Sequence, residues 1–170
     1  AKSISLREVA RQAGVSHTAP YRHFEDKAAL LAAVAEEGFA EFGQYLRAAL
    51  EPTDPIESLQ ATGAAYVRYA QDHPTHFRVM FGCFPPNETQ DSSQEEVSKS
   101  AFRHLVDVIE SGQVAGVVKA GDSNFLALGQ WAVVHGIAML LLDGMLDSAD
   151  MPNLVDGLIR SGITGILVSS

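Results

Sequence analysis

The most chemically suggestive stretch of this 170-residue chain is Gly14–Phe24, which reads GVSHTAPYRHF. It combines hydroxyls, imidazoles, a phenol and a guanidinium, which are groups that bind phosphate oxygens and the edges of bases. If the stretch forms a short helix, its first turn adds free backbone N–H groups that also favour phosphate. The candidate contacts to nucleic acid within it are Ser16, His17, Thr18, Tyr21, Arg22 and His23.

The flanking residues predict two helices that hold this stretch in place. Ser5 followed by Glu8 forms a capping box, in which each side chain satisfies the other residue's backbone N–H, and Gly14 ends the helix that starts there. Asp26 caps a long helix from about residue 27 to 50. A capped helix, a tight glycine turn and a second short helix form a helix-turn-helix. We expect Val15 and Phe24 to point inward and lock it.

Charge is distributed unevenly along the chain. The whole sequence has 12 basic and 21 acidic side chains, a net charge of −9, which alone argues against nucleic acid because a binding face must neutralise phosphates. Residues 1–30, however, hold five basic groups and three acidic ones. This local positive excess indicates an interaction surface at that end, although an excess of two charges also arises by chance.

The apolar pattern predicts an all-α protein. Apolar residues recur every three or four positions almost throughout, and strand signals are nearly absent. Caps, prolines and glycines place further helices at about 56–72, 74–81, 94–111, 123–146 and 152–168. We divide the chain into a helix-turn-helix domain, residues 1–50, and a second helical domain, residues 51–170.

Residues 5–34, SLREVARQAGVSHTAPYRHFEDKAALLAAV, resemble the DNA-binding half of the TetR family of bacterial transcriptional regulators. The positions that carry the resemblance are Val9, Ala10, Ala13, Gly14, Val15, Ser16, Tyr21, His23, Phe24, Lys27, Leu30 and Leu31. Further along, HPTHFRVMF, WAVVHG and LLLDG resemble a C-terminal regulatory domain named for a Trp-His-Gly signature. Trp131, His135 and Gly136 stand here at a looser spacing.

The resemblance implies a cytoplasmic, homodimeric regulator without enzymatic activity or a cofactor, most often a repressor. Its partners would be a palindromic double-stranded DNA operator and a small-molecule effector. Carried over by position, the residues nearest base edges would be Arg7, His17, Thr18 and Ala19. Those holding phosphates would be Ser5, Tyr21, His23 and Lys27.

Two departures from the family pattern affect this first domain. Pro20 lies inside the expected recognition helix and leaves open whether that helix starts after Ser16 or after His17, where the missing N–H costs little. The family also places an amphipathic helix ahead of Ser5, where only four residues stand. We expect about twenty further residues upstream, which would cover Leu6 and its neighbours.

The resemblance also implies that residues from about 51 onward bind the effector and dimerise. Aromatic, methionine and histidine side chains in this part offer an apolar cavity with a few polar tips. The candidates are Tyr66, Tyr69, Phe77, Met80, Phe81, Phe102, Trp131, His135 and Met139. For any single one of them, packing in the core is the simpler interpretation.

The last two helices are the candidate dimer interface. The last helix carries Gly157, Gly162 and Gly165 among apolar residues, and each glycine costs a helix up to ~1 kcal/mol relative to alanine. This cost indicates close approach by another helix. Two such helices per subunit would form a four-helix interface about a two-fold axis, with packing inside one subunit as the alternative.

Other functional classes have weaker support. Residues 123–142 hold no charged residue and just reach the length that spans a bilayer, but Asn124, Gln130 and His135 favour a buried helix of a protein without membrane insertion. The histidines and Cys83 match no zinc spacing, so we expect no metal. We find no catalytic set at a persuasive spacing, so an enzyme has little support. An all-α enzyme and a protein-binding adaptor remain as the two alternatives.

Overall fold

The computed structural model describes residues 5–49, 54–82, 92–146 and 151–168. These residues are helical with no extended strand, so the predicted all-α fold is confirmed. The elements in chain order are α1 (Leu6–Gln12), the 3-10 helix η1 (Pro20–Arg22), α2 (Lys27–Ala48), α3 (Pro55–Asp72), α4 (Pro74–Gly82), α5 (Ser92–Val114), α6 (Ser123–Leu142) and α7 (Met151–Thr164).

Aspartate caps start three of the longer helices. The carboxylate of Asp26 accepts a hydrogen bond from the N–H of Ala29 at 2.8 Å, so the predicted cap of α2 is confirmed. Asp54 and Asp122 accept from the first backbone N–H groups of α3 and α6 in the same way. Each cap satisfies donors that have no partner inside the helix, which fixes where the chain turns into it.

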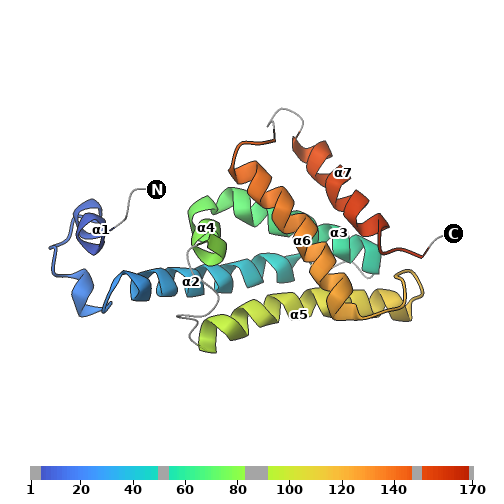
Figure 1. Ribbon diagram of the computed structural model, residues 1–170, viewed down its shortest axis with the longest axis horizontal. Coiled ribbons are helices and arrows are strands. Elements are labelled where there is room, and N and C mark those ends of the chain that lie inside the picture. Colours follow the sequence, from blue (N-terminus) through green and yellow to red (C-terminus); the bar gives the residue numbers. More distant parts are fainter. Residues whose placement is uncertain (1–4, 50–53, 83–91, 147–150, 169–170) are drawn as a thin grey trace.

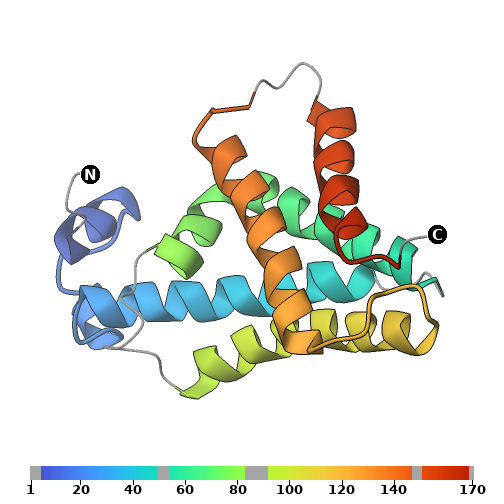
Figure 2. The same cartoon turned by 45° about the vertical axis from the view of Figure 1, so that its right-hand side comes forward.

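Helix α2 joins two parts of the molecule. Figure 1 shows α1 at one end, beyond the first turns of α2, with the remaining helices gathered around the other end of α2. In the rotated view of Figure 2, α2 and α5 run side by side while α6 crosses in front of them. The last half of α2 therefore packs inside the second helical part. The domain boundary at residue 50 stays a prediction.

The core consists of two adjoining clusters. The first, which we call the aromatic cluster, holds Ala35, Phe39, Phe42, Leu46, Tyr66, Tyr69, Ala70, Phe77, Val79, Met80 and Ala138. The second, the aliphatic cluster, holds Leu59, Val67, Val106, Ile109, Val118, Ala127, Ile137, Val155, Ile159, Ile163 and Ile166. Helix α3 contributes to both clusters, since Leu59 and Val67 belong to the aliphatic cluster while Tyr66 belongs to the aromatic cluster. The aromatic cluster joins α2 to α3 and α4, and the aliphatic cluster joins α3 to α5, α6 and α7.

Three predicted helix ends differ from those observed, and one of them is that of α7, which ends at Thr164 and not at about residue 168. Gly112 does not end α5, which continues to Val114 and is followed by the turn at Gly116, where φ is +72°. A Cβ at the buried Gly112 would lie 2.5 Å from Cγ2 of Val118. The glycine is there to let that side chain in. Helix α6 ends at Leu142 and not at Leu146, because Gly144 has a φ of +68° and turns the chain.

Helix α6 is long and apolar enough to cross a membrane by length and composition alone. About 28% of its most apolar window is buried in the fold. It packs against α3, α5 and α7. Its remaining face exposes large apolar side chains, among them Phe125 at 74% and Leu128 at 51%. Most of this window is therefore not buried within the described part of the chain, which differs from the buried helix predicted from the sequence.

Candidate DNA-contacting corner and ligand cavity

The corner between α1 and α2 is a tight turn with little α-helix. Gly14, with a φ of +69°, ends α1 as predicted. The N–H groups of Ala19 and Arg22 then bond to carbonyls three residues back, at 3.0 and 3.2 Å, which is the 3-10 pattern. Pro20 is the first residue of η1, where its missing N–H costs nothing. The second helix of the motif thus starts later than either predicted start. It is a 3-10 helix, which is wound more tightly than an α-helix.

Three local expectations in this corner were wrong. Ser16 does not cap a helix, because its hydroxyl lies 3.2 Å from that of Thr18. Val15 does not point inward, since half of it is exposed (50%). Glu8 does not complete the capping box. Ser5 Oγ accepts from the N–H of Glu8 at 3.3 Å, but the Glu8 carboxylate accepts from Arg11 instead.

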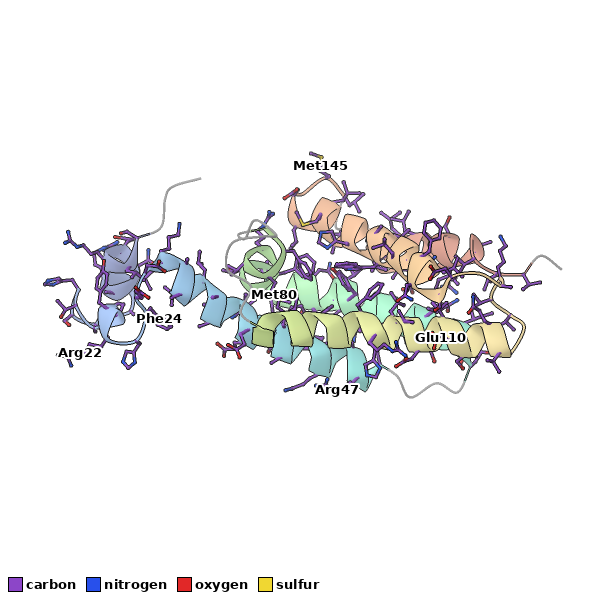
Figure 3. The ribbon with its side chains drawn as sticks, turned by 60° about the horizontal axis from the view of Figure 1, so that its bottom comes forward. Arg22, Phe24, Arg47, Met80, Glu110 and Met145 are labelled. Atoms are coloured by element: carbon purple, nitrogen blue, oxygen red, sulfur yellow. The ribbon has the colours of Figure 1, made fainter. Side chains whose placement is uncertain are left out.

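The side chains predicted to contact DNA lie at the exposed end of the molecule. Arg22 projects from the end furthest from the helical bundle, with the half-buried Phe24 beside it (Figure 3). Ala19 is half-buried. The others are exposed: Ser5, Arg7, Ser16, His17, Thr18, Tyr21, His23 and Lys27. The corner is therefore open to a large partner.

Charge in this corner is available for binding. The Arg11 guanidinium beside Glu8 holds the pKa of that carboxyl below its usual range, and the pair neutralises itself. Arg7, Arg22 and Lys27 have no ion-pair partner within the described part of the chain. Unpaired cations on an exposed surface are free to neutralise phosphates.

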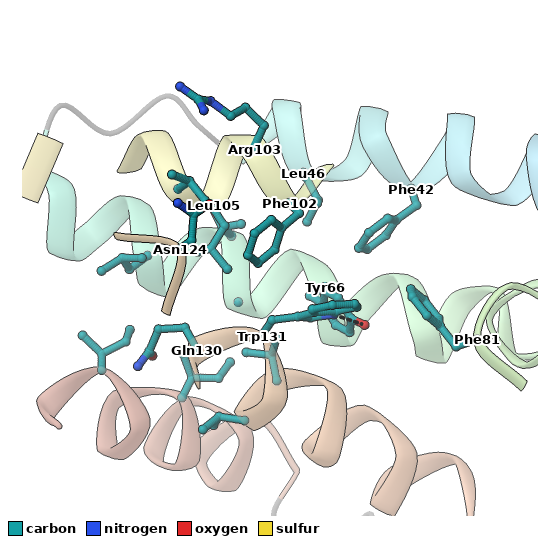
Figure 4. A pocket seen from close by; sticks show the side chains of 18 of the residues that line it. Phe42, Leu46, Tyr66, Phe81, Phe102, Arg103, Leu105, Asn124, Gln130 and Trp131 are labelled. Carbon is teal, nitrogen blue, oxygen red and sulfur yellow. Dashed lines mark hydrogen bonds between the residues drawn. The ribbon is translucent and has the colours of Figure 1, made fainter. Parts of the chain in front are cut away.

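A cavity of about 590 Å³ lies between the aromatic and aliphatic clusters, with walls from helices α2 to α7. Figure 4 shows Phe42, Tyr66 and Phe81 toward one end of it, and Asn124 and Gln130 toward the other. This volume is within the range of small-molecule sites, about 300–1,000 Å³. Apart from a few polar groups the wall is hydrocarbon.

Four of the nine predicted ligand residues line the cavity: Tyr66, Phe81, Phe102 and Trp131. The other five, which are Tyr69, Phe77, Met80, His135 and Met139, are not part of its wall. Tyr69 is fully buried, and its hydroxyl donates to the carbonyl of Gly38 on α2 at 2.9 Å. Phe77 is also fully buried. These five belong to or pack on the aromatic cluster, about one helical turn away from the cavity-facing residues.

Several residues of the wall were not among the predicted ligand contacts. On α3 the cavity face is formed by Leu59, Thr62, Gly63 and Tyr66. Their spacing of three and four residues is the signal that could have placed Thr62 and Gly63 with Tyr66. On α6, Gln130 is an amide in a segment without charged residues, and this is the signal that could have identified it as a residue of the cavity wall. The contribution of Phe39, Phe42 and Leu46 on α2 depends on tertiary packing.

A hydrogen-bonded group of three side chains supports the aromatic end of the cavity. The indole Nε1–H of Trp131 donates to the hydroxyl of Tyr66 at 3.0 Å, and this hydroxyl lies 2.9 Å from Nδ1 of His135. Burial raises the pKa of Tyr66 and lowers the pKa of His135. With the Trp131 N–H donating to it, the Tyr66 hydroxyl still has its own proton to donate, and a neutral His135 ring whose Nδ1 carries no hydrogen can accept it.

The described residues contain no group of three or more His, Cys, Asp or Glu side chains placed to hold a metal. Cys83, one of the candidate ligands considered above, lies outside them. Asp143, the acid nearest in sequence to His135, bonds at the end of α6 to Arg78 at 2.6 Å. It is therefore engaged in an ion pair away from the cavity wall.

Comparison with known proteins agrees with the geometry. Residues 2–34 match the family model described as bacterial regulatory proteins, tetR family, and residues 59–164 match the tetracyclin repressor-like C-terminal domain. A solved protein of unknown function from Rhodococcus sp. RHA1 is 34% identical, with a TM-score of 0.82 over 97% of this chain and 86% of that one.

Two further structures share the fold. A tetR-family regulatory protein from Rhodococcus RHA1 is 20% identical, with a TM-score of 0.79 over 99% of this chain and 88% of that one. The TetR family regulator PfmR from Thermus thermophilus is 18% identical, with a TM-score of 0.77 over 96% and 89%. With its exposed helix-turn-helix corner and its helical second domain, the chain belongs to the TetR family of bacterial regulatory proteins and is a DNA-binding transcriptional regulator.

Proposed function

We propose that this regulator is a cytoplasmic repressor, without enzymatic activity, which binds a palindromic operator as a homodimer and leaves it when a small molecule fills the cavity. The observation that carries the proposal is the exposed, cationic corner at one end of a chain that is otherwise acidic. A cation-rich tip on an acidic body favours a single orientation towards DNA, because the body is repelled by phosphate.

Within the corner the exposed residues divide into two roles. Arg7, His17 and Thr18, with Ala19 beside them, are placed to meet base edges in the major groove. A second set meets the phosphates on either side and positions the corner without reading sequence: Ser5, Ser16, Tyr21, Arg22, His23 and Lys27. Support for this division comes from exposure and from the family resemblance.

The homodimer forms through α6 and α7. On α6, Phe125, Leu128 and Leu140 are exposed at helical spacing, and the small Gly129 and Ala132 lie on the same face. On α7, Leu154 is 38% exposed, and a Cβ at Gly157 would meet nothing within 4 Å. An apolar face with small residues suits close helix packing about a two-fold axis.

The effect of ligand binding reaches the DNA-contacting corner through α2. Phe39, Phe42 and Leu46 on the last turns of this helix line the cavity, and Lys27 at its first residue adjoins the corner. A ligand that displaces these side chains tilts the whole helix, because the α2 backbone is continuous. Across a dimer the tilt changes the distance between the two corners, so that they no longer match successive major grooves.

The test measures binding to duplex DNA from upstream of the protein's own gene, with fluorescence anisotropy as the readout and at several salt concentrations. Arg22→Ala and Tyr21→Ala should each weaken binding about tenfold or more, and Arg22→Ala should lower the slope of log affinity against log salt by about one. Arg47→Ala removes the same charge from the bundle end of α2 and should change little. Unchanged affinity in both corner variants would refute the assignment of the corner, and no binding by the wild-type protein would refute DNA recognition.

A further inference from the structure

The polar groups at the aromatic end of the cavity are already satisfied. The Tyr66 hydroxyl engages both Trp131 and His135, and the Trp131 N–H is used in doing so. A ligand gains nothing there from a hydrogen bond, because forming one would break another. This end therefore selects only for apolar and aromatic shape.

Thr62 offers the opposite situation. Its side chain lines the cavity and is 7% exposed, and its Oγ1 is buried without a hydrogen-bond partner. Threonine within a helix usually bonds back to the carbonyl three or four residues earlier, and buried hydroxyls without a partner are rare in folded proteins. Rotation about its Cα–Cβ bond exchanges the hydroxyl and the methyl group, so the hydroxyl can be presented to an occupant of the cavity.

Gln130 adds an acceptor to the same cavity from α6. It is 8% exposed, and its Nε2 donates to the carbonyl of Gly162 on α7 at 3.2 Å. This bond fixes the orientation of the amide, because the opposite orientation would place two oxygens together. The amide oxygen Oε1 has no hydrogen-bond partner among the residues that the structure describes. Thr62 and Gln130 together thus provide a hydroxyl and a carbonyl oxygen.

Among the residues that the structure describes, the cavity wall carries no charge placed to compensate a buried anion. Arg103 is the one charged residue of this described wall, but its side chain is 67% exposed and it pairs with Asp107 at 3.1 Å. Asn124 is likewise exposed. A carboxylate or phosphate placed beside Thr62 would lose its hydration without gaining a countercharge.

We infer that the effector is a neutral molecule with an apolar, partly aromatic body and one hydroxyl or amide group, which bonds to Thr62 Oγ1, with Gln130 Oε1 as a second acceptor in the same cavity wall. This inference rests on the proposed function, in which the cavity holds the effector. The hydrogen-bonding group lies toward the aliphatic cluster, and the aromatic part lies against Phe42, Tyr66 and Phe81.

The test uses three probes of one shape: 6-phenyl-1-hexanol, hexylbenzene and 6-phenylhexanoate. Trp131 is the single tryptophan of the chain and lies in the cavity wall, so its emission reports binding. The alcohol should bind more tightly than the carboxylate. Thr62→Val, which keeps the shape of the side chain, should weaken binding of the alcohol about tenfold and that of hexylbenzene less than twofold. Thr62→Ser should retain the preference for the alcohol.

Thr62→Val should also be at least as stable to urea as the wild type, because it removes a buried hydroxyl without a partner. Equal weakening for alcohol and hydrocarbon, a preference for the carboxylate, or no change in Trp131 emission with any probe would overturn the inference. Binding of upstream DNA by the same samples separates the two proposals. If DNA binds while the probes behave in one of these ways, only the ligand chemistry is wrong; if no DNA binds, the proposed function fails whatever the probes do.

Discussion

The Tyr66 hydroxyl holds together the wall at the aromatic end of the cavity, because it is the shared partner of Trp131 and His135. Tyr66→Phe leaves the ring packing on Phe42 and Phe77 but deprives the indole N–H of its acceptor. We expect a loss of about 1–3 kcal/mol in the free energy of unfolding, measured in urea. The matched control is Tyr45→Phe, because the hydroxyl of Tyr45 bonds to Asp72 at 3.3 Å at the surface. This variant should lose less free energy of unfolding. Equal losses would contradict a special role for Tyr66.

His135 makes stability depend on pH. Burial lowers its pKa in the folded protein below the ordinary value of 6.5, and its ring neighbours are the aromatic residues Tyr66, Phe77, Phe81 and Trp131. As the pH falls through 6.5, the unfolded chain takes up a proton that the folded protein does not, so stability decreases.

Urea unfolding of the wild type and of His135→Gln at pH 7.5, 6.5 and 5.5 measures this contribution. The variant keeps a hydrogen-bonding side chain but cannot titrate, so the stability difference between the two proteins should shrink toward pH 5.5. A wild-type advantage that is constant with pH would show that His135 is protonated equally in both states.

Close approach between α6 and α7 depends on one glycine. A Cβ at Gly162 would lie 2.9 Å from Cγ1 of Val133, so Gly162→Ala forces the two helices apart or Val133 out of its rotamer. We expect Gly162→Ala to lose about 1–3 kcal/mol despite its better helix propensity. Adding Val133→Ala makes room, so the double variant should lose less than the sum of the single losses. Simple additivity in thermal or urea unfolding would rule out the contact.

The helices themselves were largely predictable from the sequence, and their partners were not. Capping residues such as Asp26 and Asp54 act on the backbone within three residues, so each local pattern is enough to place a helix start. Gly157 and Gly162 look alike in sequence, yet only Gly162 meets another helix within the described part of the chain. Likewise, the aromatic residues of α3 and α4 were identifiable as buried, but which of them face the cavity depends on how α2 and α6 pack against them.

In the whole molecule, α2 links the cavity, where the effector is proposed to bind, to the corner that is proposed to contact DNA. Its first turns leave the corner accessible, while its last turns lie between the aromatic cluster and the cavity. The Tyr69 hydroxyl bond to the Gly38 carbonyl ties α3 to the middle of the same helix. Under the proposed function, a change at the cavity would reach the corner through this one helix, and the bundle packed around it would set how far the corner moves.

The proposed recognition of an operator by two paired corners requires a dimer, which leads to the last prediction. Leu128→Glu places a charge in the middle of the exposed α6 face, where burial against a second copy would leave it unpaired. The wild type should sediment at twice the 18.2 kDa of one chain, and Leu128→Glu at the mass of one chain, with helicity retained and affinity for upstream DNA lowered at least tenfold. Val114→Glu is the control, because Val114 is 91% exposed and belongs to the end of α5, not to α6. A dimer that survives Leu128→Glu, or one lost equally with Val114→Glu, would place the subunit contact elsewhere. Loss of dimer and of operator affinity together in Leu128→Glu alone would mean that each corner by itself binds too weakly to hold DNA.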